Sequence, residues 1–202
     1  MSKNLKIALP LLVGLAVIAF FASSSLTRAQ RTMSGEWKAS IKEDGNKLQL
    51  NLERRTEKGS HNQMGQSYDF SELQGLTREQ AANGGPVKFS LVREAGRIDL
   101  EGTFQDGKGS GTFQFTANQG FVSAMKSRGF DFEKISWSDN NEGNSDDKLF
   151  AATALNVTTA LADDLVSSGF GQLNVDDLFK AAIFKIDSKF MREMKASGFP
   201  NL

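Results

Sequence analysis

Residues 149–173 read LFAATALNVTTALADDLVSSGFGQL, and residues 178–202 read LFKAAIFKIDSKFMREMKASGFPNL. A shift of 29 positions aligns the two segments without a gap and places Gly169 on Gly198. A third, partial copy, GFVSAMKSRGF at residues 120–130, aligns with the first segment at a shift of 40. Repeats of this length are typical of small helical units that stack on one another, because one unit cannot bury its apolar face alone. Such stacks usually form binding surfaces rather than active sites.

Each copy carries the signals that begin and end a short helix. Asn118, Thr158 and Asp187 fall at equivalent positions, and we expect them to be N-caps, because a side-chain oxygen can accept a hydrogen bond from a free N–H in the first turn. Eleven residues later, a glycine is expected to close the helix in the left-handed conformation, with a phenylalanine packing behind it. These glycine and phenylalanine pairs are Gly129 and Phe130, Gly169 and Phe170, and Gly198 and Phe199.

A second, preceding helix is predicted in the two full copies, over residues 148–155 and 176–184. Helices this short are not stable alone, so they must stack on each other and on the rest of the chain. Between the partial copy and the first full copy lies an acidic, turn-rich segment, residues 138–147, which we expect to be an exposed linker.

Residues 35–117 alternate between apolar and polar side chains, which predicts strands with one buried and one solvated face. Asp44-Gly45 and Asp106-Gly107 separate successive strands and are typical of tight hairpin turns. Residues 77–82 predict a short helix with Thr77 as its cap and Gln80 completing a capping box.

The predicted fold class is therefore α+β: an antiparallel β-meander of about six strands, followed over residues 118–202 by tandem short helix-pair repeats packed against it. A sheet of this kind can also close into a small barrel. We favour helices on its open face, because the helical units directly follow the last strand.

The N-terminus predicts export. Lys3 and Lys6 precede an uncharged apolar run at residues 7–22, and Thr27 and Ala29 suit a cleavage site. Residues 1–29 are thus read as a signal peptide, with an uncleaved membrane anchor as the alternative. Either interpretation predicts an extracytoplasmic location, periplasmic or secreted. If residues 1–29 are not cleaved, they attach the protein to the inner membrane.

Composition narrows the function further. The formal net charge is zero, from 24 basic and 24 acidic residues, which argues against nucleic-acid binding. The chain contains no cysteine, so disulfides, thiolate catalysis and cysteine-ligated zinc are excluded.

The stretch GTFQDGKGSGTFQFTANQGFVSAMKSRGF, residues 102–130, resembles the extracytoplasmic C-terminal region of membrane metallopeptidases of the beta-lactam-sensor type. It is also similar to free-standing bacterial envelope proteins that carry this region. The pattern covers roughly residues 35–202. The resemblance implies a non-catalytic sensor or interaction region, because the chain has no H-E-x-x-H motif and none of the matched positions is catalytic.

Metal binding is not expected. His61 is the only histidine and lies in the polar run 58–63, which predicts a solvated loop residue. The acidic residues of 138–147 do not fit a calcium-binding EF-hand loop, since the twelfth position counted from Asp139 is Phe150.

Two further groups have ordinary interpretations. Gly102, Gly107, Gly109 and Gly111 lie between two predicted strands and not before a helix, so hairpin and bulge roles are expected rather than phosphate binding. The carboxylate pairs are Asp99 with Glu101 and Asp163 with Asp164, and acid–base catalysis would require a cleft around one of them.

We therefore predict a non-catalytic extracytoplasmic interaction or sensing module without cofactors, whose partner is another envelope protein. One alternative is an envelope hydrolase that uses the carboxylates. The other is a carrier of a small apolar ligand in a cavity lined by Leu50, Phe89, Leu100 and Phe113. Phe121, Met125, Met191 and Met194 could line a partner groove, but core packing is their expected role.

Overall fold

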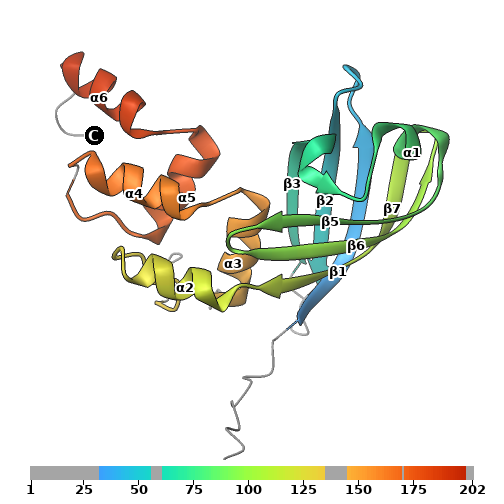
Figure 1. Ribbon diagram of the computed structural model, residues 1–202, viewed down its shortest axis with the longest axis horizontal. Helices are drawn as coiled ribbons and strands as arrows, with labels where there is room; N and C mark the ends of the chain where they lie inside the picture. The colour runs from blue at the N-terminus through green and yellow to red at the C-terminus, as the bar shows by residue number, and fades with distance from the viewer. Residues whose placement is uncertain (1–31, 56–60, 135–144, 170, 199–202) are drawn as a thin grey trace, which may run out of the picture.

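The protein is an α+β structure in which a curled antiparallel sheet is joined to a stack of short helices (Figure 1). The computed structural model describes residues 32–55, 61–134, 145–169 and 171–198. In Figure 1 the sheet lies on the right and most of the helices lie on the left. The predicted class, with helices against an antiparallel sheet, is confirmed.

Seven strands form the sheet: β1 (Thr32–Ile41), β2 (Lys47–Arg55), β3 (His61–Asp69), β4 (Leu73–Gln74), β5 (Gly85–Arg93), β6 (Gly96–Gln105) and β7 (Lys108–Ala117). Their order is β3-β2-β1-β7-β6-β5-β4, and neighbouring strands are antiparallel. Two meanders, β1–β3 and β4–β7, therefore meet where the first strand pairs with the last. The sheet starts at Thr32 rather than Gly35, because Thr32 pairs with Thr116 of β7.

Six α-helices are described: α1 (Arg78–Asn83), α2 (Gln119–Lys126), α3 (Ser145–Ala154), α4 (Thr159–Ser167), α5 (Val175–Phe184) and α6 (Ser188–Ala196). A 3-10 turn, Phe70–Glu72, precedes β4. α1 begins with the predicted capping box, in which Gln80 N donates to Thr77 Oγ1 (3.2 Å) and Thr77 N donates to Gln80 Oε1 (2.8 Å).

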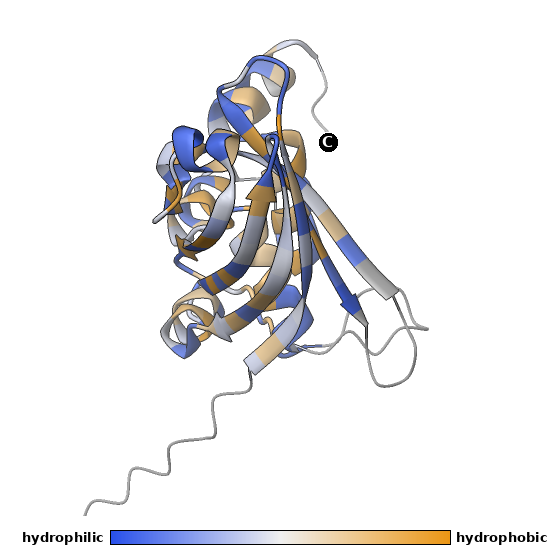
Figure 2. Cartoon of the chain, turned by 90° about the vertical axis from the view of Figure 1, so that its right-hand side faces the viewer, coloured by the Kyte–Doolittle hydropathy of each residue, from blue (hydrophilic) through white to orange (hydrophobic). Residues whose placement is uncertain are grey.

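The strands follow the alternation of their side chains. Figure 2 shows hydrophobic and hydrophilic residues alternating along them. Asp106 and Gly107 form the two-residue turn between β6 and β7, with φ angles of 49° and 74°. Two positive φ angles in succession define the hairpin turn whose twist matches that of the strands.

Three glycines of β6 and β7 make room for aromatic rings. Trp37 of β1 lies opposite Gly111, which lies opposite Gly102. A Cβ on Gly111 would lie 2.8 Å from the indole nitrogen, and a Cβ on Gly102 would lie 2.7 Å from Trp37 Cζ2. A Cβ on Gly109 would lie 2.8 Å from the Phe104 ring. The predicted bulge role is wrong for these three glycines, because the pairing of β6 with β7 is uninterrupted from Gln105↔Lys108 to Gly96↔Ala117.

Helix α3 joins the sheet to the other helices. Seven consecutive residues, Lys148–Ala154, are buried, and the helix packs against β3, β5, β6 and β7. The Phe150 ring stacks on Phe113 with centroids 5.4 Å apart and meets Phe115 edge-on at 5.5 Å. Tyr68 Oη of β3 donates a hydrogen bond to Ala154 O (2.9 Å). A helix buried on all sides belongs to the core rather than to a surface layer.

We call α2, α4, α5 and α6 the helical lobe. Within it, Asn118, Thr158 and Asp187 each accept a hydrogen bond from a backbone N–H in the first turn of the helix that follows. The donors are Gly120 (3.0 Å), Leu161 (3.1 Å) and Phe190 (2.7 Å), in that order. The side chains thus act as N-caps of α2, α4 and α6.

Gly129, Gly169 and Gly198 have φ angles of 93°, 72° and 92° and follow the ends of the same helices. After α2, Phe130 N donates to Met125 O (3.0 Å) and Gly129 N to Lys126 O (3.1 Å), which is the Schellman pattern. Phe130 is buried in the core. The predictions for Phe170 and Phe199 lie outside the described residues.

The two full copies also resemble each other at the ends of their first helices, α3 and α5. Val157 N donates to Ala152 O (2.9 Å), and Ile186 N donates to Ala181 O (2.9 Å), at a shift of 29. The intervening Asn156 and Lys185 are both left-handed, with φ angles of 56° and 54°. Non-glycine residues seldom adopt this conformation. The surroundings differ, however, because α3 packs on the sheet whereas α5 packs on α4.

The helical lobe and the sheet share one hydrophobic core. The Phe132 ring lies between Phe121 of α2 (5.5 Å) and Phe179 of α5 (6.1 Å). At the β5–β6 turn, Glu94 Oε2 accepts a hydrogen bond from Thr159 N (2.9 Å) at the start of α4. This hydrogen bond is therefore a second contact between the sheet and the helical lobe, in addition to the shared core.

The prediction of an exposed linker over residues 138–147 is wrong for its last three residues. α3 begins at Ser145, so Asp146 and Asp147 lie in its first turn, where carboxylates interact favourably with the helix dipole. Asp147 also forms an ion pair with Arg54 of β2. Residues 138–144 lie outside the described residues.

Candidate functional site

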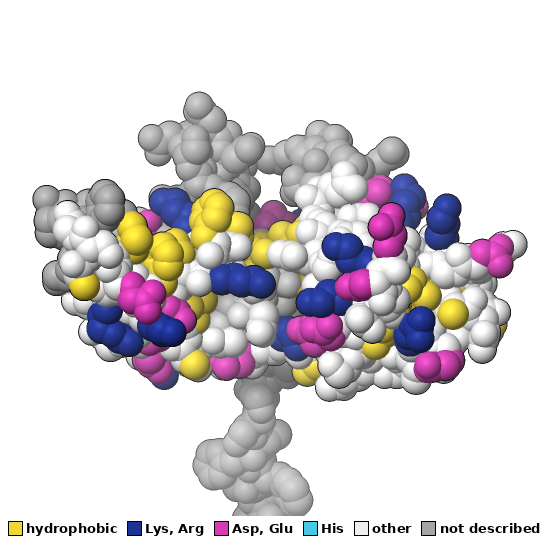
Figure 3. All heavy atoms as spheres, turned by 90° about the horizontal axis from the view of Figure 1, so that it is seen from above, with side chains coloured by type: hydrophobic (Ala, Val, Ile, Leu, Met, Phe, Trp, Pro, Cys, Tyr) yellow, Lys and Arg dark blue, Asp and Glu magenta, His cyan; other side chains and the backbone are white. Residues whose placement is uncertain are grey.

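The clearest surface feature is a group of exposed hydrophobic side chains on the helical lobe. Val166 of α4, Ile183 and Phe184 of α5, and Phe190 of α6 are 56%, 52%, 72% and 42% exposed. We call these four residues the helical-lobe patch. Figure 3 shows hydrophobic side chains among both basic and acidic side chains on the helical side of the molecule, at the left of the view. Exposed apolar groups that gather on one face mark interaction sites.

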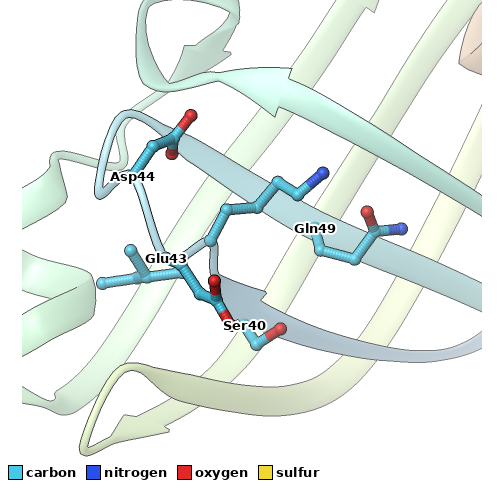
Figure 4. Close-up of a pocket in the computed structure, with 6 residues that line it drawn as sticks. Ser40, Glu43, Asp44 and Gln49 are labelled. Atoms are coloured by element: carbon cyan, nitrogen blue, oxygen red, sulfur yellow. The ribbon is translucent and has the colours of Figure 1, made fainter.

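The best-formed depressions on the described surface are shallow. One lies at the β1–β2 hairpin, between Ser40, Glu43, Asp44 and Gln49 (Figure 4). Asp44 Oδ1 there accepts from Asn46 N (3.0 Å), so this carboxylate stabilises its own turn. The depression is open to solvent, whereas acid–base catalysis by carboxylates requires a cleft that shields them from water.

The second depression lies beside the start of α2 and includes Arg93 and Arg97. Arg93 forms an ion pair with Glu72, and Arg97 Nε forms one with Asp99 (2.7 Å). Both cations are therefore already paired within the protein, and the depression offers no free positive charge for an anion.

The first predicted carboxylate pair is not a catalytic dyad. Asp99 Oδ1 accepts from Ser90 Oγ (2.6 Å) and Arg97 Nε (2.7 Å). Partial burial works to raise the pKa of the Asp99 carboxyl, but the hydrogen bonds from Ser90 and Arg97 outweigh it and hold this pKa below its usual value. Glu101 lies on the same strand and pairs with Lys88 (3.7 Å).

The second pair holds helices together. Asp163 accepts from Arg128 through both oxygens (2.7 and 3.0 Å), and Asp164 Oδ2 accepts from Ser188 N (2.6 Å) at the start of α6. The hydrogen bonds from Arg128 and from Ser188 lower the pKa of the Asp163 and Asp164 carboxyls respectively. Asp163 connects α4 to the turn after α2, and Asp164 connects α4 to α6. No local pattern in the sequence predicts either contact.

The predicted metal and ligand sites can be placed as well. His61 is the first residue of β3, opposite Arg55, so the expected loop position is wrong. Within the described ranges, no three His, Asp or Glu side chains lie close enough to hold a metal ion. No helix in these ranges is by itself long and apolar enough to cross a membrane; only α3 and α4 together pass that test, and they meet at 90°.

The four residues proposed to line an apolar cavity are packed instead. Leu50, Phe89, Leu100 and Phe113 are each 1% exposed. The Phe89 ring meets Trp37 edge-on at 5.4 Å, and Phe113 is stacked by Phe150. Aromatic side chains thus fill the space between the sheet and α3.

One buried charge is not explained by the predictions. Lys148, in α3, is 4% exposed, and its Nζ donates a hydrogen bond to Lys134 O. Burial lowers the pKa of the Lys148 amine, while the nearby Asp176 and Asp131 partly offset this effect. The contact fixes the start of α3 to the loop after α2.

Tyr68, the only tyrosine, gives a direct optical test of the α3 junction. Burial raises the pKa of the Tyr68 phenol above its ordinary value of about 10. The contribution of Tyr68 to the free energy of unfolding is therefore fully present below pH ~10. It is lost as the pH rises further, because the phenol ionises more readily in the unfolded chain than in the folded one. Absorbance of tyrosinate should therefore appear together with loss of helical circular dichroism. Titration at pH ~10 with the fold intact would contradict the packing of Tyr68 against α3.

Comparison of the chain with protein-family models, with curated proteins and with solved structures finds no match. The surfaces and contacts described above are therefore the basis of the functional argument.

Proposed function

We propose that this chain is a non-catalytic interaction module of the extracytoplasmic envelope and that it engages its partner through the helical-lobe patch. The observation that carries the proposal is the position of the exposed hydrophobic groups. The four large hydrophobic side chains that are exposed among the described residues all belong to α4, α5 and α6. In contrast, none of the large hydrophobic side chains in the described part of the sheet is exposed in this way.

Helices α5 and α6 contribute three of these four side chains, Ile183, Phe184 and Phe190. Exposed aromatic side chains that neighbouring described residues do not cover are typical of surfaces that bind a partner.

The location is proposed from the N-terminus. The basic residues and apolar run of residues 1–29 favour export or anchoring, and the resemblance of residues 102–130 to an extracytoplasmic sensor region agrees with it. The partner is accordingly a component of the envelope.

The two alternatives have less support. A hydrolase would need one of the carboxylate pairs in a cleft, but Asp99, Asp163 and Asp164 are held by hydrogen bonds to neighbouring groups. A carrier would need an apolar cavity at Phe89 and Phe113, where Trp37 and Phe150 pack.

Site-specific photocrosslinking in the native envelope tests the proposal. A photoreactive phenylalanine analogue at position 184 should form products with an envelope component. The same analogue at exposed position 108, on the β6–β7 hairpin, is the matched control and should not. Identical products from the two positions, or none from either, would refute a binding role for the helical-lobe patch.

A further inference from the structure

The α5–α6 corner combines exposed aromatic groups with an excess of positive charge. Residues 180–195 contain five basic residues and two acidic ones in a chain whose net charge is zero. Lys180, Lys185, Lys189 and Arg192 are exposed. The acidic residues of α5 itself, Asp176 and Asp177, lie in its first turn, about 10 Å or more along the helix from Phe184.

Part of this charge is only weakly neutralised within the protein. Lys189 Nζ lies 3.9 Å from Glu193, with both side chains mostly exposed. An exposed pair of this kind is worth little, so its cation can turn to another anion at small cost. Arg192 Nη1 donates to the neutral Ser188 hydroxyl, and the exposed guanidinium also interacts electrostatically with the Asp164 carboxylate. The corner therefore presents positive charge beside Phe184 and Phe190.

Aromatic side chains flanked by Lys and Arg are the chemistry of interfacial membrane binding. The rings enter the boundary between headgroups and acyl chains, and the cations attract anionic lipid. Each Lys or Arg near such a surface strengthens binding about fivefold. Three apolar side chains alone would bind weakly, but an apolar N-terminal segment held in the same membrane would raise the effective concentration of the patch at its surface.

We propose that the helical-lobe patch rests on an anionic lipid bilayer surface, with Ile183, Phe184 and Phe190 entering the interface and Lys185, Lys189 and Arg192 contacting headgroups. The inference rests on the proposed function and specifies the envelope component that the patch engages. A polar or acidic protein surface would satisfy the cations but would leave the rings exposed, so lipid fits the combination better.

The absence of cysteine makes a clean experiment possible, because one introduced cysteine is the only labelling site. The full-length chain carrying Ile183→Cys is labelled with an environment-sensitive fluorophore and reconstituted into vesicles with brominated acyl chains. One set of vesicles is phosphatidylcholine alone, and the other contains equal parts of phosphatidylcholine and phosphatidylglycerol. Lys108→Cys, labelled in the same way, is the control position, on the β6–β7 hairpin of the sheet.

Bromolipid should quench the label at position 183 in the anionic vesicles and much less in the neutral ones, and the label at position 108 in neither. Salt that shortens the Debye length to about 3 Å should weaken the quenching. The Lys185→Glu/Lys189→Glu double variant should lower partition of the corner into lipid by about 25-fold or more, whereas Lys42→Glu/Lys108→Glu, with the same change in charge, should have little effect.

Equal quenching of both labels, or none at position 183 in anionic vesicles, would overturn the lipid proposal. Photocrosslinking from position 184 then distinguishes failure of the lipid proposal alone from failure of the proposed function. A heterologous protein partner captured only from that position would leave the interaction module standing with a protein as its ligand. Absence of both quenching and specific crosslinks would remove the proposed function as well.

Discussion

The Gly111→Ala variant is expected to lose about 3 kcal/mol of unfolding free energy, near the upper end of the range for overpacked cores. The added methyl would lie 2.0 Å from Glu101 O and 2.8 Å from Trp37 Nε1. Neither group can move freely, because one is backbone within a paired strand and the other is an indole that is fully buried. Urea denaturation followed by circular dichroism gives the measurement.

Gly120→Ala is the matched control for this substitution. A Cβ at Gly120 meets only Asn118 Oδ1 at 3.2 Å, and the residue lies in the first turn of α2, where alanine is the better helix former. Its unfolding free energy should stay within about 1 kcal/mol of the parent. Equal stability of the two variants would mean that the indole does not lie across Gly111.

Phe150→Ala should cost about 3–5 kcal/mol, the usual range for removing a buried phenylalanine. Its ring fills the space between α3 and the sheet, where it contacts both Phe113 and Phe115. The same denaturation experiment measures the loss. Because Phe150 fixes α3 to the sheet and α4 directly follows α3 in the chain, the variant should also separate the sheet from the helical lobe in unfolding, with helical signal lost at lower urea than Trp37 burial.

Phe184→Ala provides the comparison on an equivalent residue type. This side chain is 72% exposed, so its removal should change stability by no more than about 0.5 kcal/mol. A large loss from Phe184→Ala, or a small one from Phe150→Ala, would show that the assignment of core and surface is reversed.

Local signals in the sequence were sufficient for the ends of many elements. The capping residues and the hairpin turn act over four residues or fewer, because the groups that interact are close together in the chain. Examples are Thr77 with Gln80, Asn118, and Asp106-Gly107. Phe130 follows the same logic, because its N–H bonds five residues back to Met125.

Contacts between distant segments could not be predicted in this way. The pairing of β1 with β7 joins Thr32 to Thr116, and nothing near either residue specifies the other. Gly107 correctly predicted the hairpin. The role of Gly111 was not predicted, because it depends on Trp37, which lies on a strand far away in the sequence. The end of α5 at Phe184 was predicted, but the left-handed conformation of Lys185 was not, because lysine rarely adopts it.

The candidate site was only partly predictable for a related reason. Periodicity identifies the apolar side of a helix, but it does not say how much of that side a neighbour covers. Phe179 and Phe184 lie in one helix, yet the first is 3% exposed and the second 72%. The packing of α5 against α4 and against Phe132 separates the core residue from the surface one.

Helix α3 shares one hydrophobic core with the sheet and the helical lobe, and native-state hydrogen exchange measures directly whether they form one cooperative unit. We predict that the amides of α3 exchange with the same opening free energy as those of β6 and β7, because Phe150 and the buried residues around it share the core of the sheet. Fast exchange throughout α3, while β6 and β7 stay protected, would contradict the account.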